Sequence, residues 1–228
     1  MITILHLYPR ELGINGDVGN VMALAKRAQL RGLEVRILDH EVGKPLPKSV
    51  DLIHIGSGPA SGQALVKDDV ALIAHGLREW ADAGVPFLAI AGGWQLLGRT
   101  LTALDGSRTA GVGIFPTDTV LTTNRIVDEV YGPSALGDVA GFENHGSRFT
   151  MDEPDSTIAH TRGVVYGSRV ATNLHGPFLP MNPVWADWLL ERAATSAGVE
   201  LGGADERLAL LDDFAERSRA AVKSRLGV

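Results

Sequence analysis

The chain has 228 residues, of which 45% are hydrophobic and 21% are charged. This composition is typical of a globular protein with a full hydrophobic core, and it excludes a disordered or fibrous chain. The formal net charge is −6, with lysine and arginine scattered along the chain, which argues against a nucleic-acid-binding surface and a polybasic membrane patch. Small molecules or other proteins are therefore the expected partners.

The amino-terminal segment is apolar for only about eight residues before Glu11 and Asp17 follow, so it predicts neither a signal peptide nor a membrane-spanning helix. We expect a cytoplasmic protein without membrane insertion. The chain contains no cysteine, which excludes disulfides, thiolate metal sites and a cysteine nucleophile. Its seven histidines are dispersed and show no metal-ligand spacing, so no metal site is predicted.

Short apolar runs alternate with longer amphipathic stretches in the first half of the chain. Strands are predicted at residues 2–8, 34–38, 51–55 and 85–90, and helices at residues 18–31, 64–83 and 93–103. Continuously apolar strands that alternate with helices are typical of a parallel sheet covered on both faces. The predicted fold class is α/β, doubly wound, with a mostly parallel sheet and helices on both faces.

The pattern changes in the second half. Residues 111–173 contain short runs rich in Thr, Val, Gly and Pro, which predict antiparallel strands and hairpins. Helices are predicted at residues 183–197 and about 204–226, the latter with an apolar stripe made by Leu208, Leu211, Phe214, Ala215 and Val222.

We predict one domain, residues 1–198, with a helical extension, residues 199–228. No internal repeat or low-complexity linker divides the chain. The stripe of the extension is expected to pack on the chain's own core, with a partner protein as the alternative.

The segment VPFLAIAGGWQLLG, residues 85–98, contains a buried strand that runs directly into Gly92 and Gly93, where a helix begins. So sharp a turn lifts the corner residue, Ala91, to the carboxyl edge of the sheet, where open α/β sheets hold ligands and catalytic side chains. The first N–H groups of the helix suit an oxyanion or a thiolate. A double glycine can also be only a structural turn, and this segment alone leaves both interpretations open.

The segment AIAGGWQLLG resembles the nucleophile elbow of class I glutamine amidotransferases, and specifically of their cobyric-acid-synthase-like branch, which has cysteine at the position of Ala91. Three further segments agree in order and spacing: YPRELGINGDVGN from Tyr8, GFENHG from Gly141 and HGPFLPMNP from His175. Together they are similar to glutaminase subunits that act with a Mur-ligase-like subunit to amidate the D-glutamate of a peptidoglycan precursor. The resemblance covers roughly residues 1–190 and implies a flavodoxin-like class I amidotransferase fold.

The resemblance implies hydrolysis of glutamine to glutamate and ammonia, with Ala91 at the nucleophile position and His175 as the general base. Many class I glutaminases have an acid two positions after this histidine, but here that residue is Pro177. Asp17 is the acid that the resemblance most readily offers, although aspartate in a glycine-rich loop is commonly only a turn residue. The third catalytic residue stays open.

The backbone N–H groups of Gly58 and Gly92 are the expected oxyanion hole. Substrate-binding residues are expected to be Gly56, Gln95, Arg125 and His145. Arg125 would bind the α-carboxylate of glutamine, whereas His145 and Glu143 could either line the glutamine pocket or stabilise a loop. Glycines after strands are also required by tight turns, so their residue type alone decides nothing.

No cofactor is expected in this chain. The spaced glycines of GINGDVGN suggest a phosphate loop, but no Gly-Lys-Ser/Thr sequence follows and Lys26 is too far along the helix. The resemblance implies that ATP and Mg²⁺ are bound by a Mur-ligase-like synthetase subunit, with which the chain would form a heterodimer.

A methyl group at position 91 cannot attack glutamine, so the chain as written is expected to be inactive. A deliberate Cys→Ala replacement is favoured over a natural non-catalytic subunit that binds or scaffolds the synthetase. A third alternative is a glutaminase for another acceptor, such as a corrinoid acid. The short chain disfavours this alternative, because cobyric acid synthase carries its synthetase domain on the same polypeptide.

Overall fold

The structure is a computed structural model that describes residues 1–175 and 177–228. The described helices are α1 (Val18–Leu30), α2 (Ala60–Asp82), α3 (Gly92–Leu97), α4 (Phe178–Met181), α5 (Pro183–Ala197) and α6 (Glu206–Leu226). The larger sheet contains β1 (Ile2–Leu7), β2 (Val35–His40), β3 (Leu52–Ile55), β4 (Phe87–Ile90), β9 (Ser156–Ile158), β10 (Gly163–Tyr166) and β11 (Arg169–Thr172). The smaller sheet contains β5 (Thr100–Thr102), β6 (Arg108–Ala110), β7 (Thr117–Gly132), β8 (Val139–Met151) and β12 (Leu174–His175).

The larger sheet has the strand order β2-β1-β3-β4-β11-β10-β9. Its first five strands are parallel, and β10 and β9 continue it antiparallel. Because β1 lies between β2 and β3, the direction of winding reverses at β1, and the loops that follow β1 and β3 face each other across this switch point. Open α/β sheets bind their ligands there, outside the carboxyl ends of the strands.

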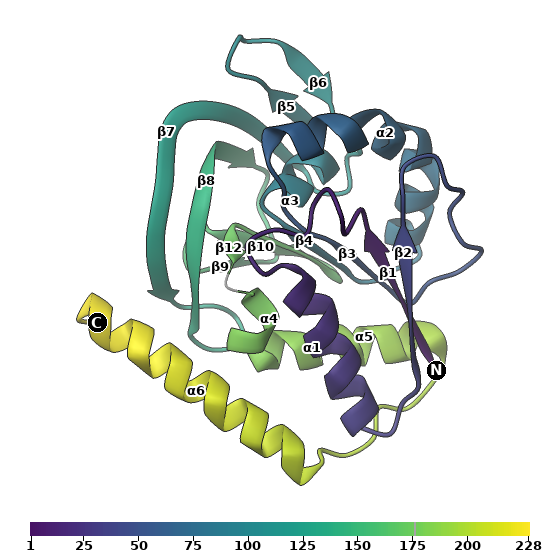
Figure 1. Ribbon diagram of the computed structural model, residues 1–228, viewed down its shortest axis with the longest axis vertical. Coiled ribbons are helices and arrows are strands. Elements are labelled where there is room, and N and C mark those ends of the chain that lie inside the picture. The colour runs from purple at the N-terminus through teal and green to yellow at the C-terminus, as the bar shows by residue number, and fades with distance from the viewer. Residues whose placement is uncertain (176) are drawn as a thin grey trace.

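Two hydrophobic cores lie on opposite faces of the larger sheet. One packs α1, α4 and α5 against the sheet and contains Leu24, Leu88 and Leu189. The other packs α2 and α3 against the sheet and contains Leu77 and Trp94. Figure 1 shows α2 and α3 grouped apart from α1, α4 and α5. The prediction of an α/β fold with helices on both faces is confirmed.

The smaller sheet is dominated by the long antiparallel pair β7 and β8, which arches beside the larger sheet (Figure 1). The pairing register shifts between Leu121 and Ile126, so β7 carries an irregularity there. β12 pairs with β8 directly after β11 leaves the larger sheet, and His175 lies opposite Phe142. The chain therefore passes from the larger sheet to the smaller one at Asn173.

The predicted helix at residues 93–103 is wrong beyond its first half. α3 ends at Leu97, because Gly98 is extended and the N–H of Arg99 donates to the carbonyl oxygen of Thr117 in β7 at 2.7 Å. A Cβ atom at Gly98 would lie 2.9 Å from the same oxygen. The next residues form β5, which pairs with β6 and β7. The β-branched Thr100 and Thr102 suit this strand.

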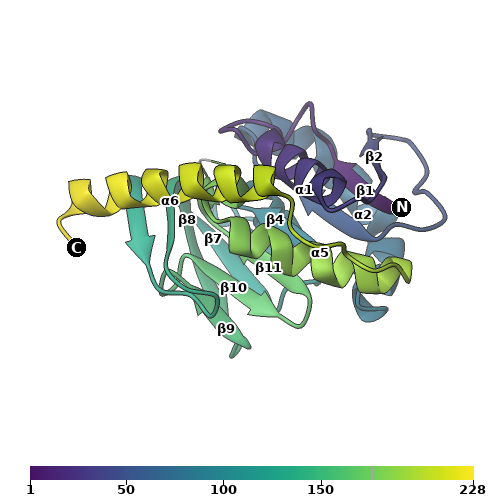
Figure 2. The ribbon, with the colours of Figure 1, turned by 90° about the horizontal axis from the view of Figure 1, so that it is seen from below.

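α6 packs against α1, α4, β7 and β8, and Figures 1 and 2 show it running along one side of the molecule. Its buried residues, Leu208, Ala215 and Val222, are seven positions apart. Fewer side chains of α6 are buried than the predicted apolar stripe contains, because Leu211 and Phe214 are 41% and 51% exposed. The extension thus packs on the chain's own fold along one row of side chains.

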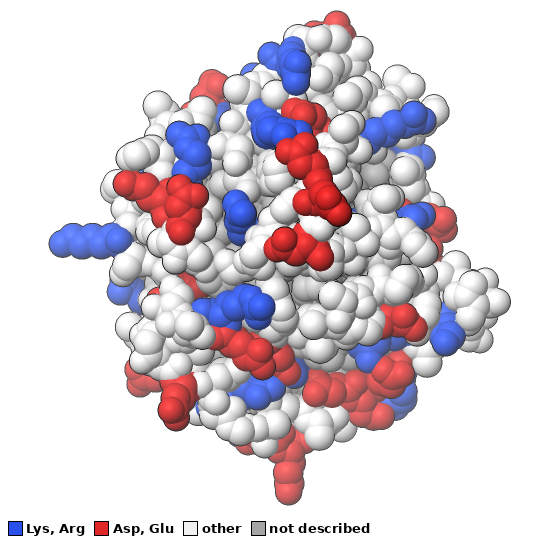
Figure 3. All heavy atoms as spheres, turned by 180° about the vertical axis from the view of Figure 1, so that it is seen from behind, with Lys and Arg blue, Asp and Glu red and all other residues white. Residues whose placement is uncertain are grey.

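Charged side chains of both signs are interspersed on the face of the molecule shown in Figure 3. Within the described residues, no helix is both long and apolar enough to cross a membrane.

Candidate active site

The corner between β4 and α3 has the sharp geometry predicted for residues 85–98. Ala91 has φ 40° and ψ −98°, a strained conformation for a residue with a Cβ atom. Its N–H donates to the carbonyl oxygen of Thr172 at 2.9 Å, which ties the corner to β11. Gly93 must be glycine here, since a Cβ atom would lie 2.7 Å from the carbonyl oxygen of Ile55. Packing against the end of β3 thus holds the corner in its strained shape.

His175 and Asp17 form a buried pair, although 158 residues separate them in the chain. His175 Nδ1 lies 3.1 Å from Asp17 Oδ1, and neither side chain is exposed to solvent. The ring of His175 packs beside Phe142 at a centroid distance of 5.5 Å. Its other nitrogen, Nε2, is buried and has no partner among the described residues. The pair therefore has the histidine–acid geometry expected of a base and its orienting group.

Asp17 is held from three directions. Its Oδ2 accepts the N–H of Ser57 at 2.8 Å, and its backbone carbonyl oxygen lies 3.1 Å from His54 Nε2. Burial raises the pKa of Asp17, opposed by its hydrogen bond and charge interaction with His175. Burial, with His6 nearby, lowers the pKa of His54 to about 3, so His54 is neutral and donates from Nε2. These contacts fix the carboxyl group against His175.

A cavity of about 380 Å³ opens in front of the corner. Its lining includes six of the nine predicted site residues: Ala91, Gly58, Gly92, Gln95, Arg125 and His145. Asp17 and His175 lie buried outside this lining. A volume of this size matches a small-molecule site.

Arg125 lies where the pairing register of β7 and β8 shifts. Its Nε donates to Asn144 Oδ1 at 2.8 Å, on the neighbouring strand. Of the residues that line the cavity, Arg125 carries the permanent positive charge. It can therefore pair with a carboxylate that enters the cavity.

His145 lines the cavity with both ring nitrogens already engaged. Nδ1 lies 2.9 Å from Ser147 Oγ and Nε2 lies 3.1 Å from Glu143 Oε1, and all three residues share one face of β8. Glu143 Oε2 also accepts from Arg162 Nε at 3.3 Å. Burial would raise the pKa of Glu143, but its hydrogen bonds and charge interactions with His145 and Arg162 hold that pKa below its usual range. Of the two predicted alternatives, this geometry favours a structural role.

Gly56 and Gly58 are glycines because the loop after β1 passes directly over them. A Cβ atom would lie 2.2 Å from the carbonyl oxygen of Leu12 at Gly56, and 2.1 Å from that of Glu11 at Gly58. Gly58 lines the cavity, whereas Gly56 lies outside its lining. The structure therefore places Gly56 under the loop rather than beside a substrate.

Ser57 is the site residue that the sequence analysis missed. It lines the cavity, its N–H donates to Asp17, and its Oγ accepts the N–H of Gly92 at 3.4 Å. The available signal was its position at the carboxyl end of β3, between two glycines.

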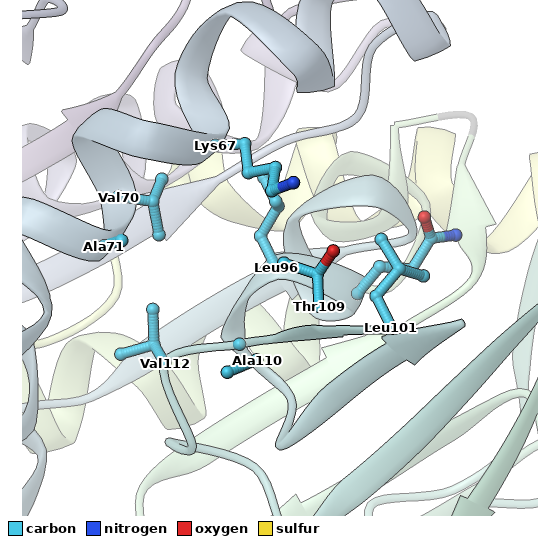
Figure 4. A pocket seen from close by; sticks show the side chains of 10 residues that line it. Lys67, Val70, Ala71, Leu96, Leu101, Thr109, Ala110 and Val112 are labelled. Atoms are coloured by element: carbon cyan, nitrogen blue, oxygen red, sulfur yellow. The ribbon is translucent and has the colours of Figure 1, made fainter. Parts of the chain in front are cut away.

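A second, smaller cavity of about 40 Å³ lies between α2, α3 and β6. Figure 4 shows Val70 and Ala71 on one side of it and Leu96, Ala110 and Val112 on the other. Gln95 lines both cavities, and its Oε1 is buried without a partner in the described part of the chain. This amide is free to bind a ligand atom or an ordered water. Across residues 1–175 and 177–228, no group of three or more His, Cys, Asp or Glu side chains could hold a metal ion.

The doubly wound sheet and the corner after β4, with a buried histidine–aspartate pair behind it, define a glutamine amidotransferase fold of class I. A solved structure of a glutamine amidotransferase matches 83% of this chain and 98% of its own, with a TM-score of 0.59 at 14% sequence identity, which is a likeness of fold. The chain belongs to the CobB/CobQ-like glutamine amidotransferase domain family, whose model matches residues 3–183.

Two relatives have the same printed name, lipid II isoglutaminyl synthase (glutamine-hydrolyzing) subunit GatD. The protein from Staphylococcus aureus (strain N315) is 34% identical, over 87% of this chain and 86% of the relative. The protein from Streptococcus pneumoniae (strain ATCC BAA-255 / R6) is 25% identical, over 93% of this chain and 86% of the relative. The segment that begins at His175 includes Gly176, which lies outside the described residues.

Proposed function

We propose that this chain is the glutamine-handling subunit of an enzyme that amidates the D-glutamate of lipid II, and that Ala91 leaves it without a nucleophile. The two GatD relatives support the acceptor, and their description as subunits supports a second chain. The second chain in this proposal is a Mur-ligase-like synthetase that binds ATP and Mg²⁺ and activates the carboxylate to be amidated.

The arrangement around Ala91 carries the proposal. A strained corner at Ala91, the N–H of Gly92 and a buried His175–Asp17 pair are the parts that a cysteine glutaminase requires. Ser57 links the pair to the corner, because its N–H bonds Asp17 and its hydroxyl oxygen accepts from Gly92. The free Nε2 of His175 suits a base that receives a thiol proton. The cavity with Arg125 suits an amino acid whose α-carboxylate needs a cationic partner.

With cysteine at position 91, His175 would take the thiol proton and the sulfur would attack the side-chain amide carbon of glutamine. The carbonyl oxygen would gain a negative charge, stabilised by the N–H groups of Gly58 and Gly92. As the C–N bond breaks, His175 would return the proton to the leaving nitrogen and release ammonia. Water would then hydrolyse the γ-glutamyl thioester to glutamate and restore the thiol.

A second candidate is a natural non-catalytic subunit that binds or scaffolds the synthetase. Ala91 itself favours it, since the 228 residues contain no cysteine. The two candidates differ in what a restored thiol does.

The test measures ammonia and glutamate release from glutamine by the parent chain and by Ala91→Cys, each with the Mur-ligase-like partner. Ala91→Cys is expected to raise the rate by at least about 10³-fold, because nucleophile and base act as a unit. Ala91→Ser is the matched control, since it adds a group of similar size without an acidic thiol, and it should stay near the parent. If both proteins fold and bind the partner but Ala91→Cys releases no ammonia, the scaffold function replaces the glutaminase.

A further inference from the structure

The backbone of Ser57 is fixed on both sides, in the turn after β3. Its N–H donates to Asp17 Oδ2 at 2.8 Å, and its carbonyl oxygen accepts the N–H of Ile14 at 3.1 Å. Both partners belong to the loop that follows β1. The side chain is the part of Ser57 that can still rotate, and it lines the cavity that Ala91 and Gly92 also line.

The Ser57 hydroxyl has one contact among the described residues: its oxygen accepts the N–H of Gly92 at 3.4 Å. This distance is longer than the usual 2.7–3.2 Å for such a bond, so the bond is weak. The hydrogen of the hydroxyl has no acceptor in the described part of the chain. The hydroxyl therefore has an unused donor directly beside the N–H that the proposed reaction needs.

An oxygen atom that enters the cavity to bind the N–H of Gly92 must displace the Ser57 oxygen. The incoming oxygen then lies next to a hydroxyl that has lost its partner and can turn its hydrogen toward it. A bond from O–H to an oxyanion is charge-assisted and roughly twice as strong as a neutral one. It gains most of its strength only as the negative charge develops, which is the condition for lowering a barrier.

We propose that the Ser57 hydroxyl is a catalytic residue of this site: it caps the N–H of Gly92 while the cavity is empty and donates its O–H to the oxyanion once glutamine reacts. This inference rests on the proposed glutaminase function. Ser57 links the two halves of the site, because its backbone N–H holds the acid that positions His175 while its side chain serves the oxyanion. The side-chain amide of Gln63 also lies close to Gly92: a Cβ atom on Gly92 would be 2.6 Å from Gln63 Nε2.

The experiment introduces Ser57→Ala and Ser57→Thr into Ala91→Cys, with the synthetase partner present, and measures kcat and KM for glutamine hydrolysis. Ser57→Ala keeps the backbone bonds and removes only the hydroxyl, so kcat is expected to fall about 10²-fold, as for loss of one oxyanion donor, with KM changed less than about threefold. Ser57→Thr restores a hydroxyl and is expected to recover most of kcat. Ser168→Ala removes a hydroxyl that bonds the carbonyl oxygen of Gly84 at the surface, and it should match Ala91→Cys.

Three outcomes overturn the inference. If Ser57→Ala keeps kcat within twofold of Ala91→Cys, the hydroxyl takes no part in the reaction. If Ser57→Ala and Ser57→Thr lose kcat equally and both lower the melting temperature, Ser57 has only a structural role. If Ala91→Cys itself releases no ammonia, the proposed function fails first and the role of Ser57 fails with it, which separates this outcome from the other two.

Discussion

Asp17 is the residue on which the geometry behind the cavity most depends. One carboxylate oxygen lies within hydrogen-bond distance of His175 Nδ1, and the other accepts the N–H of Ser57. The side chain of Asp17 is fully buried. Burial raises its pKa, so the fold destabilises the charge that the pair needs. Sites that hold a charge at such a cost commonly trade stability for activity.

Asp17→Asn should stabilise the chain at neutral pH, because asparagine can keep both contacts without a buried charge. The folded pKa of Asp17 lies above the unfolded value of about 3.9, so its contribution to stability is complete below about pH 4 and is lost as pH rises through the folded pKa. The advantage of Asp17→Asn should therefore grow from about pH 4 upward and then level off. Thermal unfolding between pH 4 and 8 measures it, with the exposed Asp82→Asn as control. An advantage that shrinks as pH rises contradicts the prediction.

The His175–Asp17 pair shows which site residues could be predicted from the sequence. Ala91 was predicted from the sharp turn after a buried strand, and His175 from the resemblance of its segment to a known family. Asp17 was the acid that the resemblance most readily offered, but only the folded chain shows that it reaches His175 Nδ1. Ser57 was missed because a hydroxyl in a turn becomes informative only when the position of the Gly92 N–H is known.

Charged side chains help to hold α6 against the rest of the molecule. Arg27 of α1 is buried, with its side chain 5% exposed, and it bonds Asp187 of α5 and Asp212 of α6. One guanidinium thus ties three helices together. Since α6 buries only a single row of side chains, these ion pairs add to its docking, as does the pair between Arg225 and Glu129 of β7.

Arg27→Ala should loosen α6 and destabilise the chain by about 2 kcal/mol, because Asp212 loses its buried partner while Asp187 keeps only Arg31. Hydrogen exchange should rise in residues 206–226 before it rises in the strands of the larger sheet. Arg217→Ala breaks an exposed pair within α6 and should cost less than about 1 kcal/mol. Equal effects of the two variants would show that the buried pair does not hold the helix.

The predicted helices and strands agree with the structure where a segment has a clear hydrophobic pattern of its own. The positions of β1 to β4 followed from their largely apolar runs. The prediction was wrong for β11, which pairs parallel with β4 although residues 111–173 were expected to form antiparallel strands, because its four residues have no pattern that shows the direction of pairing. The end of α3 depends on a contact between Gly98 and Thr117. These two residues lie 19 positions apart, so the hydrophobic pattern of one segment could not predict the contact. β12 has only two residues, too few to show any period, yet it contains His175.

At the scale of the whole molecule, the two cores share one sheet. Residues of β1, β3 and β4 alternate between them, so that Leu88 belongs to one core and Phe87 to the other. A defect in either core therefore disturbs strands on which the other depends. This is the arrangement of a single cooperative unit.

Leu24→Ala and Leu77→Ala remove fully buried side chains from opposite cores, and each should cost about 2–5 kcal/mol. Each variant should still unfold in one transition, with the same midpoint by far-ultraviolet and tryptophan signals. Calorimetry of the two variants checks this expectation. Two separate transitions in either variant would mean that the faces fold independently.

The strain at Ala91 also bears on the stability of the chain. Alanine at a φ of 40° keeps a strain of order 1–3 kcal/mol, which glycine would relieve. Under the proposed glutaminase function, the corner holds this strain in order to present a reactive side chain at position 91. The methyl group of Ala91 keeps the strain without supplying the nucleophile.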